Sequence, residues 1–361
     1  MEHTEDSIAL LNQIPNPAFF VRDDTVTAVN EAATMRGLCV GSRISSMIEL
    51  GRDEYAAFQS GCLYLTLRIC DIPCSVSVTQ AAGQHLFVLE QEEDQAELQS
   101  MALAAKALRT PLSNVMTVAD RLFPLADTND SPEAQEQVAR INRGLYQMLR
   151  IVCNMSDAYL YSIENTARME VREVGSLMRE IFEESAPLIA YTGITLRYTG
   201  PNEPIYSLVD AEKLERAVGN ILSNAVKFSS KGSLIEASLI RRGTRLYLTV
   251  RDNGQGIPAH LRGTVYQRYL REPGVEDGRF GIGLGMVLIR RAAAVHGGTV
   301  LMDLAENNGL QLTMTLQIRQ SGDPNVRSPR ILVDYAGERD RRLLELADCL
   351  PIELYRRENV N

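Results

Sequence analysis

Amide, ammonium and carboxylate side chains in the second half of the chain are spaced as a nucleotide site would need them. Asn220, Asn224 and Lys227 stand at positions i, i+4 and i+7, so a helix would present all three on one face. Carboxamide oxygens can complete the oxygen shell of Mg²⁺, and a lysine ammonium can neutralise phosphate. A strand-like run over 205–209 and a helix-capping residue, Asp210, precede them. We therefore predict a helix that binds magnesium and phosphate.

A glycine motif that begins with Asp252 follows this helix. It reads Asp-Asn-Gly-Gln-Gly and ends a β-like run over 246–250. Its glycines, Gly254 and Gly256, let a ligand approach the backbone closely. A carboxylate at this place can accept a hydrogen bond from an exocyclic amine such as that of adenine. The motif therefore favours base recognition by Asp252.

A second glycine motif, with Gly281, Gly283 and Gly285, opens an apolar helix over 286–295. The free N–H groups and the positive dipole end at the start of such a helix suit a polyphosphate. Each motif is weak by itself, because similar glycine patterns occur in ordinary turns and helix starts. Their order and spacing together indicate a pocket for ATP with Mg²⁺.

These motifs resemble those of the sensor histidine kinases of two-component systems, whose ATP-binding domain belongs to the same superfamily as gyrase-type ATPases. Residues 220–228 are similar to the asparagine box of that family. Residues 252–258 and 281–285 are similar to its two glycine boxes, and residues 265–271 to its phenylalanine box, with tyrosines at both aromatic positions. The resemblance implies a kinase-type ATP-binding domain, with residues 271–280 as its lid.

The family resemblance also assigns roles to single residues. It implies that Asp252 reads adenine, that Asn224 together with Asn220 holds Mg²⁺, and that Lys227 contacts phosphate. Arg268 would reach the γ-phosphate.

Two positions depart from the family pattern. Hydrolytic members carry a glutamate four residues before the magnesium asparagine, whereas Asn220 stands here and cannot take a proton from water. Phosphoryl transfer or simple ATP binding is therefore favoured over rapid hydrolysis. Further on, residues 309–313 replace an expected Gly-x-Gly-Thr, with Thr313 as the last predicted pocket residue.

The pattern of helices and strands expected around these residues predicts an α+β multidomain protein. We expect four parts: a PAS-like α/β sensor domain over 1–91, a dimerising helical hairpin over 92–166, an α/β sandwich ATP-binding domain over 167–320, and a linker with a short β-α extension over 321–361.

The N-terminal part resembles the PAS sensor fold. A strand-like run over 17–21 is followed by a turn, a second strand over 26–29 and the residues Asn-Glu-Ala-Ala. Three β-like runs follow over 62–69, 74–78 and 85–89. With no flavin-attachment cysteine motif recognisable, a domain that only dimerises is favoured over a ligand sensor.

The next part predicts two antiparallel helices. Apolar residues recur every three or four positions in each helix, which is typical of a heptad seam. The seams comprise Leu98, Met101, Ala105, Leu108, Leu112, Val115, Ala119 and Leu122, then Val138, Ile141, Leu145, Met148, Val152 and Met155. Two helices cannot bury both seams alone, so we expect a homodimeric four-helix bundle.

The place of the phosphoacceptor is the most informative departure from the family. The family motif His-Glu-Leu-Arg-Thr-Pro-Leu corresponds here to residues 106–112, with Lys106 for the histidine and Ala107 for the acid. An exposed lysine, with a pKa near ~10.4, is protonated and has no lone pair for attack. Lys106 is therefore interpreted as a solvated charge, and none of the four histidines lies on the hairpin.

Composition narrows the classes of protein to which this sequence could belong. A net charge of −9 without a basic patch argues against nucleic-acid binding. No apolar run approaches the roughly 20 residues that span a bilayer, and the acidic start is no signal peptide, so a cytosolic protein with reduced cysteines is expected. Cys62, Cys70 and Cys74 could bind a metal, but buried apolar cysteines are favoured.

Three functional hypotheses remain. The first, which we favour, is a histidine-kinase-like signalling protein that binds Mg-ATP and forms a homodimer but does not phosphorylate itself at the usual place. The second is an active kinase that phosphorylates a histidine on another protein, for example within a heterodimer. The partner would then be a histidine-bearing protein or a response regulator. The third is a non-enzymatic PAS scaffold with a residual ATP pocket.

Overall fold

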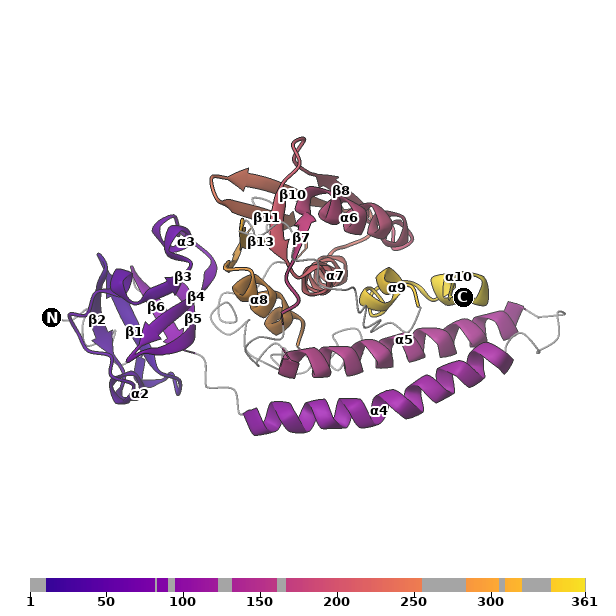
Figure 1. Cartoon of the computed structure of the whole chain (residues 1–361), viewed down its shortest axis with the longest axis horizontal. Coiled ribbons are helices and arrows are strands. Elements are labelled where there is room, and N and C mark those ends of the chain that lie inside the picture. Colours follow the sequence, from indigo (N-terminus) through magenta and orange to yellow (C-terminus); the bar gives the residue numbers. More distant parts are fainter. Residues whose placement is uncertain are drawn as a thin grey trace.

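The computed structural model describes residues 11–81, 83–89, 95–122, 132–160, 167–254, 284–304, 309–319 and 339–360. They form a mixed α/β structure with one long sheet, a helical hairpin and helices between the two (Figure 1). Within these residues no helix is long and apolar enough to cross a membrane. The same residues contain no group of three or more His, Cys, Asp or Glu side chains placed to hold a metal ion.

The N-terminal unit is a sheet with short helices against it. Its strands are β1 (Ala18–Arg22), β2 (Thr25–Val29), β3 (Ile48–Leu50), β4 (Cys62–Ile69), β5 (Ile72–Ala81) and β6 (Gln84–Leu89), and its α-helices are α2 (Glu31–Met35) and α3 (Arg52–Ala56). The strand order is β2-β1-β6-β5-β4, with β3 added on β4. Asn30 joins the first strands to α2, because its side-chain oxygen accepts from the backbone N–H groups of Ala18 and Ala33, at 3.0 and 2.9 Å.

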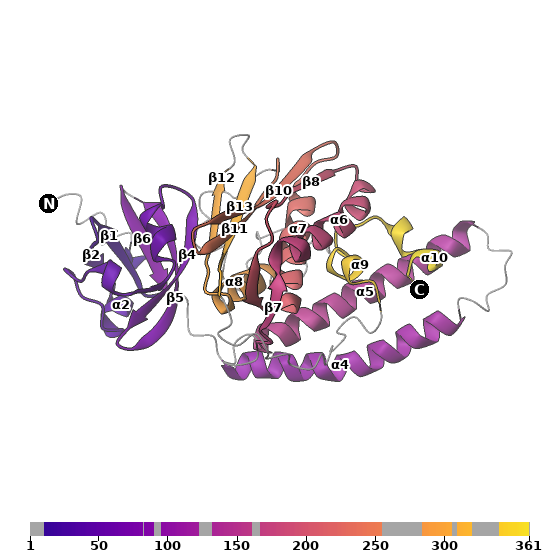
Figure 2. The same cartoon turned by 45° about the horizontal axis from the view of Figure 1, so that its top comes forward.

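The predicted hairpin is present as α4 (Gln95–Leu122) and α5 (Pro132–Leu160), which run antiparallel along one side of the molecule (Figures 1 and 2). The expected seams are divided between two environments. Buried seam residues hold the hairpin together within one chain: Ala105, Leu112, Ala119, Leu145 and Val152. Other seam residues are 47–54% exposed: Leu108, Val115, Ile141 and Met148. The single chain therefore leaves an apolar strip of the hairpin exposed.

The second half of the chain continues the sheet and covers one face of it with helices. Its elements are β7 (Glu170–Glu173), α6 (Val174–Ala190), β8 (Thr195–Thr199), β9 (Tyr206–Val209), α7 (Ala211–Phe228), β10 (Leu234–Arg242), β11 (Arg245–Arg251), α8 (Gly285–Val295), β12 (Val300–Leu304) and β13 (Leu310–Gln317). The strand order is β12-β13-β11-β10-β8, and β7 pairs separately with β9. Helices α6, α7 and α8 pack on the sheet through a common apolar core (Figure 2).

The two sheets are joined into one. Strand β4 pairs antiparallel with β12, with Tyr64 opposite Val300 and Cys62 opposite Met302. A guanidinium from α8, that of Arg290, lies 4.5 Å from the centre of the Tyr64 ring. The sequence predicted separate domains and gave no sign of this shared sheet.

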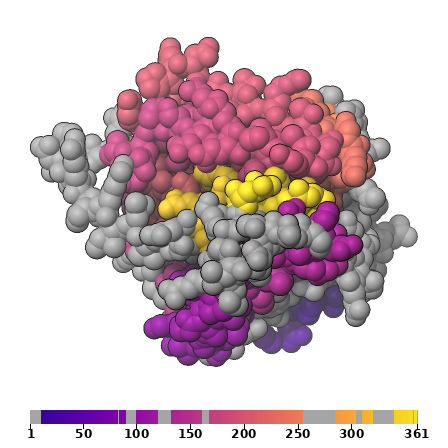
Figure 3. Space-filling model, turned by 90° about the vertical axis from the view of Figure 1, so that its right-hand side faces the viewer, coloured from indigo at the N-terminus to yellow at the C-terminus, as the bar shows by residue number. Residues whose placement is uncertain are grey.

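The C-terminal segment, residues 339–360, packs back onto the rest of the chain. It contains α9 (Arg341–Glu345), a 3-10 turn (Ile352–Tyr355) and α10 (Arg357–Val360). Of the β-α extension expected over 321–361, the structure describes residues 339–360, which are helical in part; residues 321–338 lie outside the described residues. Figure 3 shows this segment in yellow as a band between the second half of the chain and the hairpin.

Candidate functional site

Helix α7 begins where the sequence predicted, directly after β9. Asp210 caps it, since its carboxylate accepts from the backbone N–H of Lys213 at 3.1 Å. The backbone N–H of Asp210 in turn donates to Nε2 of His296, at 3.0 Å. The apolar face of α7 joins the core of the sheet, so its polar face turns toward α8, the hairpin and the C-terminal segment.

The predicted magnesium and phosphate residues lie on that polar face. Asn220 is 2% exposed and donates to the carbonyl of Arg216 at 2.8 Å. The side-chain nitrogen of Asn224 lies 3.7 Å from the sulfur of Met286, in the first turn of α8. A Cβ added to Gly285 would stand 3.0 Å from Oδ1 of Asn220. The structure thus brings the asparagine motif together with Gly285, the last glycine of the second glycine motif.

Asp252 is 5% exposed and is held by the backbone at the end of β11. Its Oδ1 accepts from the N–H groups of Gly254, at 2.8 Å, and Leu310, at 3.1 Å. Burial raises the pKa of this carboxyl, and the two backbone donors partly offset the rise. A Cβ on Gly254 would lie 2.3 Å from the carbonyl oxygen of Phe228, so this loop touches the end of α7.

Thr313, the last predicted pocket residue, lies on β13. Its hydroxyl lies 3.1 Å from that of Thr249, on the neighbouring strand β11. Near the start of β13, the backbone N–H of Leu310 donates to Asp252. A Cβ at Gly309 would stand 1.9 Å from the backbone oxygen of Asp252. A glycine at this position therefore lets the backbone of residues 309–313 lie close to that of Asp252.

Several predicted site residues are not described by the structure. Gly256, Gly281, Gly283, Arg268 and the lid over 271–280 lie outside the described residues.

Lys106 is described and lies exposed on α4. Its neighbour Ala107 is also exposed. The place of the usual phosphoacceptor therefore faces solvent and carries neither a neutral nucleophile nor a carboxylate base.

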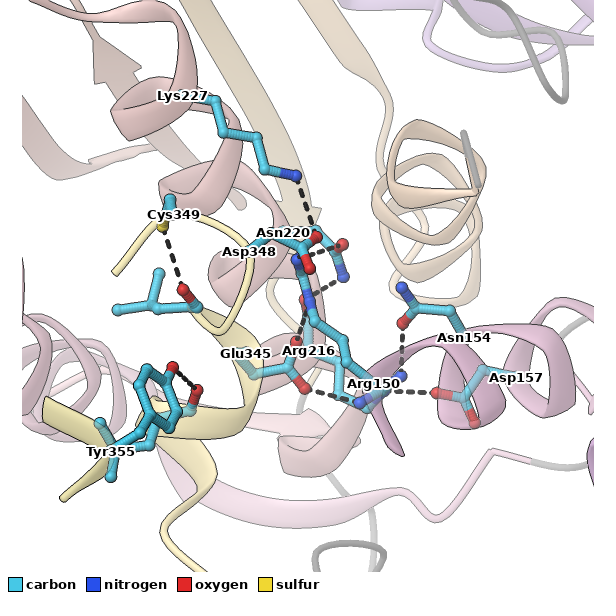
Figure 4. A network of polar contacts seen from close by, with 12 residues as sticks. Arg150, Asn154, Asp157, Arg216, Asn220, Lys227, Glu345, Asp348, Cys349 and Tyr355 are labelled. Carbon is cyan, nitrogen blue, oxygen red and sulfur yellow. Dashed lines mark hydrogen bonds and ion pairs between the residues drawn. The ribbon is translucent and has the colours of Figure 1, made fainter. Parts of the chain in front are cut away.

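A charged network that the sequence did not predict surrounds the polar face of α7 (Figure 4). Nζ of Lys227 lies 3.0 Å from Oδ2 of Asp348, in the C-terminal segment. The same Asp348 oxygen is bound by Arg150 of α5, which also donates to Oδ1 of Asn220 at 3.1 Å. Burial lowers the pKa of Lys227, and the Asp348 carboxylate partly offsets the fall. Two of the three predicted phosphate and magnesium residues are therefore already in contact with this network.

A second part of the network is centred on Arg216, one turn before Asn220. This side chain is 1% exposed. It donates to Oε1 of Glu345 at 2.6 Å and to Oδ1 of Asn154 at 2.7 Å, and it forms an ion pair with Asp157. A buried guanidinium needs such partners, because an unpaired charge in the interior is strongly destabilising. Helix α7 is thus bound to both the hairpin and the C-terminal segment by charge.

Comparison with known proteins identifies the class of the nucleotide-binding half. Residues 209–320 match the family model for the histidine kinase-, DNA gyrase B- and HSP90-like ATPases. That range begins at the end of β9 and contains α7, Asp252, α8 and β13. It therefore includes the whole predicted pocket.

Relatives extend the similarity beyond residues 209–320. The hybrid signal transduction histidine kinase D of Dictyostelium discoideum is 25% identical over 248 residues, which is 67% of this chain and 16% of that protein. The adaptive-response sensory kinase SasA of Crocosphaera subtropica is 26% identical over 235 residues, 63% of this chain and 61% of that protein. The chain thus spans less than two thirds of each of these relatives. Residues 209–320 thus carry a histidine-kinase-like ATPase domain, and both relatives to which the chain is similar are signalling histidine kinases.

A solved structure shares the fold over much of the chain. The crystal structure of full-length ShkA in complex with AMPPNP matches this chain with a TM-score of 0.51 and 21% sequence identity. The match covers 69% of this chain and 54% of the ShkA chain.

Proposed function

We propose that this chain is a signalling protein of the histidine kinase type that binds Mg-ATP and does not phosphorylate itself at the usual place. The observation that carries the proposal is the joint placement of Asn220, Gly285 and the backbone-held Asp252 around one face of α7. The missing Cβ of Gly285 leaves room beside the amide of Asn220. The grouped amides, the ammonium of Lys227 and the buried carboxylate fit the donor set that magnesium, phosphate and adenine need.

Within this proposal each side chain has a distinct task. Asn224 and Asn220 would hold Mg²⁺, Lys227 would neutralise phosphate, and Asp252 would accept a hydrogen bond from the adenine amine. Asn220 cannot serve as a general base for water, which favours retention of bound ATP or transfer of its phosphoryl group over hydrolysis. The exposed Lys106 does not accept that group, since its ammonium has no free electron pair.

We further propose that the N-terminal unit is a PAS-like domain. Its hairpin of β1 and β2, short helices and final three-strand meander support this reading.

A second copy of the chain would cover the hairpin. The exposed apolar strip of Leu108, Val115, Ile141 and Met148 supports a dimeric four-helix bundle.

Calorimetry with Mg-ATP on the full chain tests nucleotide binding. Asp252→Ala should weaken binding by about 1–3 kcal/mol, as expected for a lost hydrogen bond in a buried site. Asp71→Asn is a matched control, because Asp71 lies in a turn of the N-terminal sheet at a positive φ that asparagine also tolerates. Absence of Mg-dependent ATP binding in the unmodified chain, or equal binding by the Asp252 variant, would contradict the proposal.

Labelled ATP separates the proposed function from the alternative in which the chain phosphorylates a histidine on another protein. We expect no acid-labile label on the chain itself after incubation with γ-labelled ATP. Transfer of label to an added histidine-bearing partner would instead establish an active kinase.

A further inference from the structure

The anion next to Lys227 in this structure is a carboxylate from the chain's own C-terminal segment. Asp348 is held between Lys227, at 3.0 Å, and the guanidinium of Arg150. Both cations are nearly buried, with side chains 7% and 4% exposed. Two buried cations that converge on one oxygen form a site for an anion, because each of them would be costly to leave unpaired.

The contact is part of an extended attachment. Glu345, the last residue of α9 and three residues before Asp348, accepts from Arg216 of α7 at 2.6 Å. Gly219 lies directly beneath it, and a Cβ at that glycine would stand 2.7 Å from Cβ of Glu345. Glycine inside a helix costs about 1 kcal/mol relative to alanine, and here it permits the C-terminal segment to lie against the face that carries Asn220.

The hairpin supplies the other side of the attachment. Gln147 of α5 donates to the carbonyl of Ala347 at 3.3 Å. Tyr355 is fully buried, with its ring 5.4 Å from that of Tyr146, and Asn142 donates to its carbonyl at 3.0 Å. The segment is therefore held between α5 and α7, and Figures 1 and 2 show α9 beside both helices.

We propose that residues 339–360 form an internal competitor of the nucleotide, in which the carboxylate of Asp348 takes the place of a phosphate at Lys227 and Arg150. The inference rests on the proposed ATP site and concerns its regulation. A nucleotide phosphate and the Asp348 carboxylate carry the same sign and require the same cations, so they exclude each other. Release of the segment leaves Lys227 and Arg150 without a counter-charge, and this favours entry of an anionic ligand.

Competition of this kind lowers the apparent affinity for nucleotide. The apparent dissociation constant equals the intrinsic constant divided by the fraction of chains whose segment is released. If about 1% of chains are released, opening the segment tightens binding by up to about 100-fold.

Two variants of the full chain test the competition by different routes. Asp348→Asn removes the competing charge at the pocket. Tyr355→Ser loosens the segment at its hairpin anchor and changes no charge near Lys227. Glu353→Gln is the control, since Glu353 is an exposed carboxylate of the same segment. Mg-ATP affinity is measured by calorimetry, and hydrogen exchange of the amides of residues 341–350 reports whether the segment is released.

We expect both test variants to bind Mg-ATP at least about 10-fold more tightly than the unmodified chain, while Glu353→Gln does not differ from it. Addition of Mg-ATP should speed amide exchange over residues 341–350 in the unmodified chain. The proposal is overturned if affinity is the same in all four proteins, or if these amides stay protected when nucleotide is bound. Tighter binding by Asp348→Asn alone would also overturn it, because that result indicates a local charge effect without displacement.

Failure of the proposed function gives a different pattern. In that case no protein binds Mg-ATP, although rapid exchange in the Tyr355 and Asp348 variants shows that the segment is released. That pattern would refute the ATP site and the competition together, whereas equal nonzero affinities would refute the competition alone.

Discussion

Protonation of His296 should destabilise the fold as the pH falls below 7. The ring is 1% exposed and lies at the end of α8. Its Nε2 accepts from the backbone N–H of Asp210, which can only donate, and its Nδ1 therefore carries the proton that is shared with the carbonyl of Ala292 at 2.7 Å. A second proton on Nε2 would face the N–H of Asp210, donor to donor. Burial lowers the pKa of His296, and the hydrogen bond to Ala292 partly offsets this.

The sign and size of the effect follow from proton linkage. Unfolded histidine has a pKa of about 6.5, so below this pH the unfolded chain binds a proton that the folded chain resists. Stability from the neutral ring is complete above about pH 7 and falls as the pH drops through 6.5 toward the lowered native value. If the native ring stays neutral, the free energy of unfolding loses about 1.2 kcal/mol between pH 7 and 5.5.

Urea unfolding of the unmodified chain and of His296→Gln at both pH values measures this loss. The variant should show a pH-dependent loss smaller by up to about 1.2 kcal/mol, whatever its stability at pH 7. His85→Gln is the comparison, because burial also lowers the pKa of His85 but its ring is only partly buried. An unchanged pH dependence in His296→Gln would refute the assignment.

Three further perturbations follow from the structure. Gly61→Ala should lower the free energy of unfolding, measured in urea, by about 2 kcal/mol more than Gly83→Ala does. Both glycines have positive φ, but a Cβ at Gly61 would stand 2.1 Å from the backbone oxygen of Met302, whereas a Cβ at Gly83 would have nothing within 4 Å. Leu108→Glu, on the exposed strip, should dissociate the proposed dimer, so that light scattering at micromolar concentration detects a monomer. Lys106→His combined with Ala107→Glu should create acid-labile phosphorylation by labelled ATP. Lys106→His alone should be phosphorylated at a rate lower by about 10²–10⁴-fold, because the general base is missing.

Each of these predictions has an outcome that contradicts it. Equal stability of the two glycine variants would show that the close approach to β12 costs nothing. A Leu108→Glu chain that remains dimeric would place the second copy elsewhere. A folded, ATP-binding and dimeric double variant at 106 and 107 that stays unlabelled would mean that the missing acceptor is not the only reason for inactivity.

Features that depend on local chemistry were predictable from the sequence. The start of α7 was predicted because a strand and the capping Asp210 precede it. Strand β4 was predicted over its full length, 62–69, from its β-branched and apolar run. Asp252 was placed at the end of β11 for the same local reasons.

Features that depend on distant contacts were not predictable. Arg150 and Asp348 are separated by 198 residues, and no local pattern distinguishes their buried ion pair from solvated surface charges. The hairpin was assessed by its apolar seams and by the residues at 106 and 107, so Arg150 carried no prediction. Gly219 was a possible signal, because a glycine inside an otherwise regular helix often marks a close neighbour.

The pairing of β4 with β12 removes an edge from the sheet. Without the N-terminal unit, β12 would expose a row of unpaired backbone N–H and C=O groups, flanked by the apolar Val300 and Met302. Exposed strands of this kind recruit other chains, and natural proteins protect them. The N-terminal unit therefore acts as a cover as well as a domain. A shortened chain that begins at α4 would carry every predicted ATP residue and yet be prone to aggregate, so the boundary that the sequence suggests between these domains is a poor place to divide the protein.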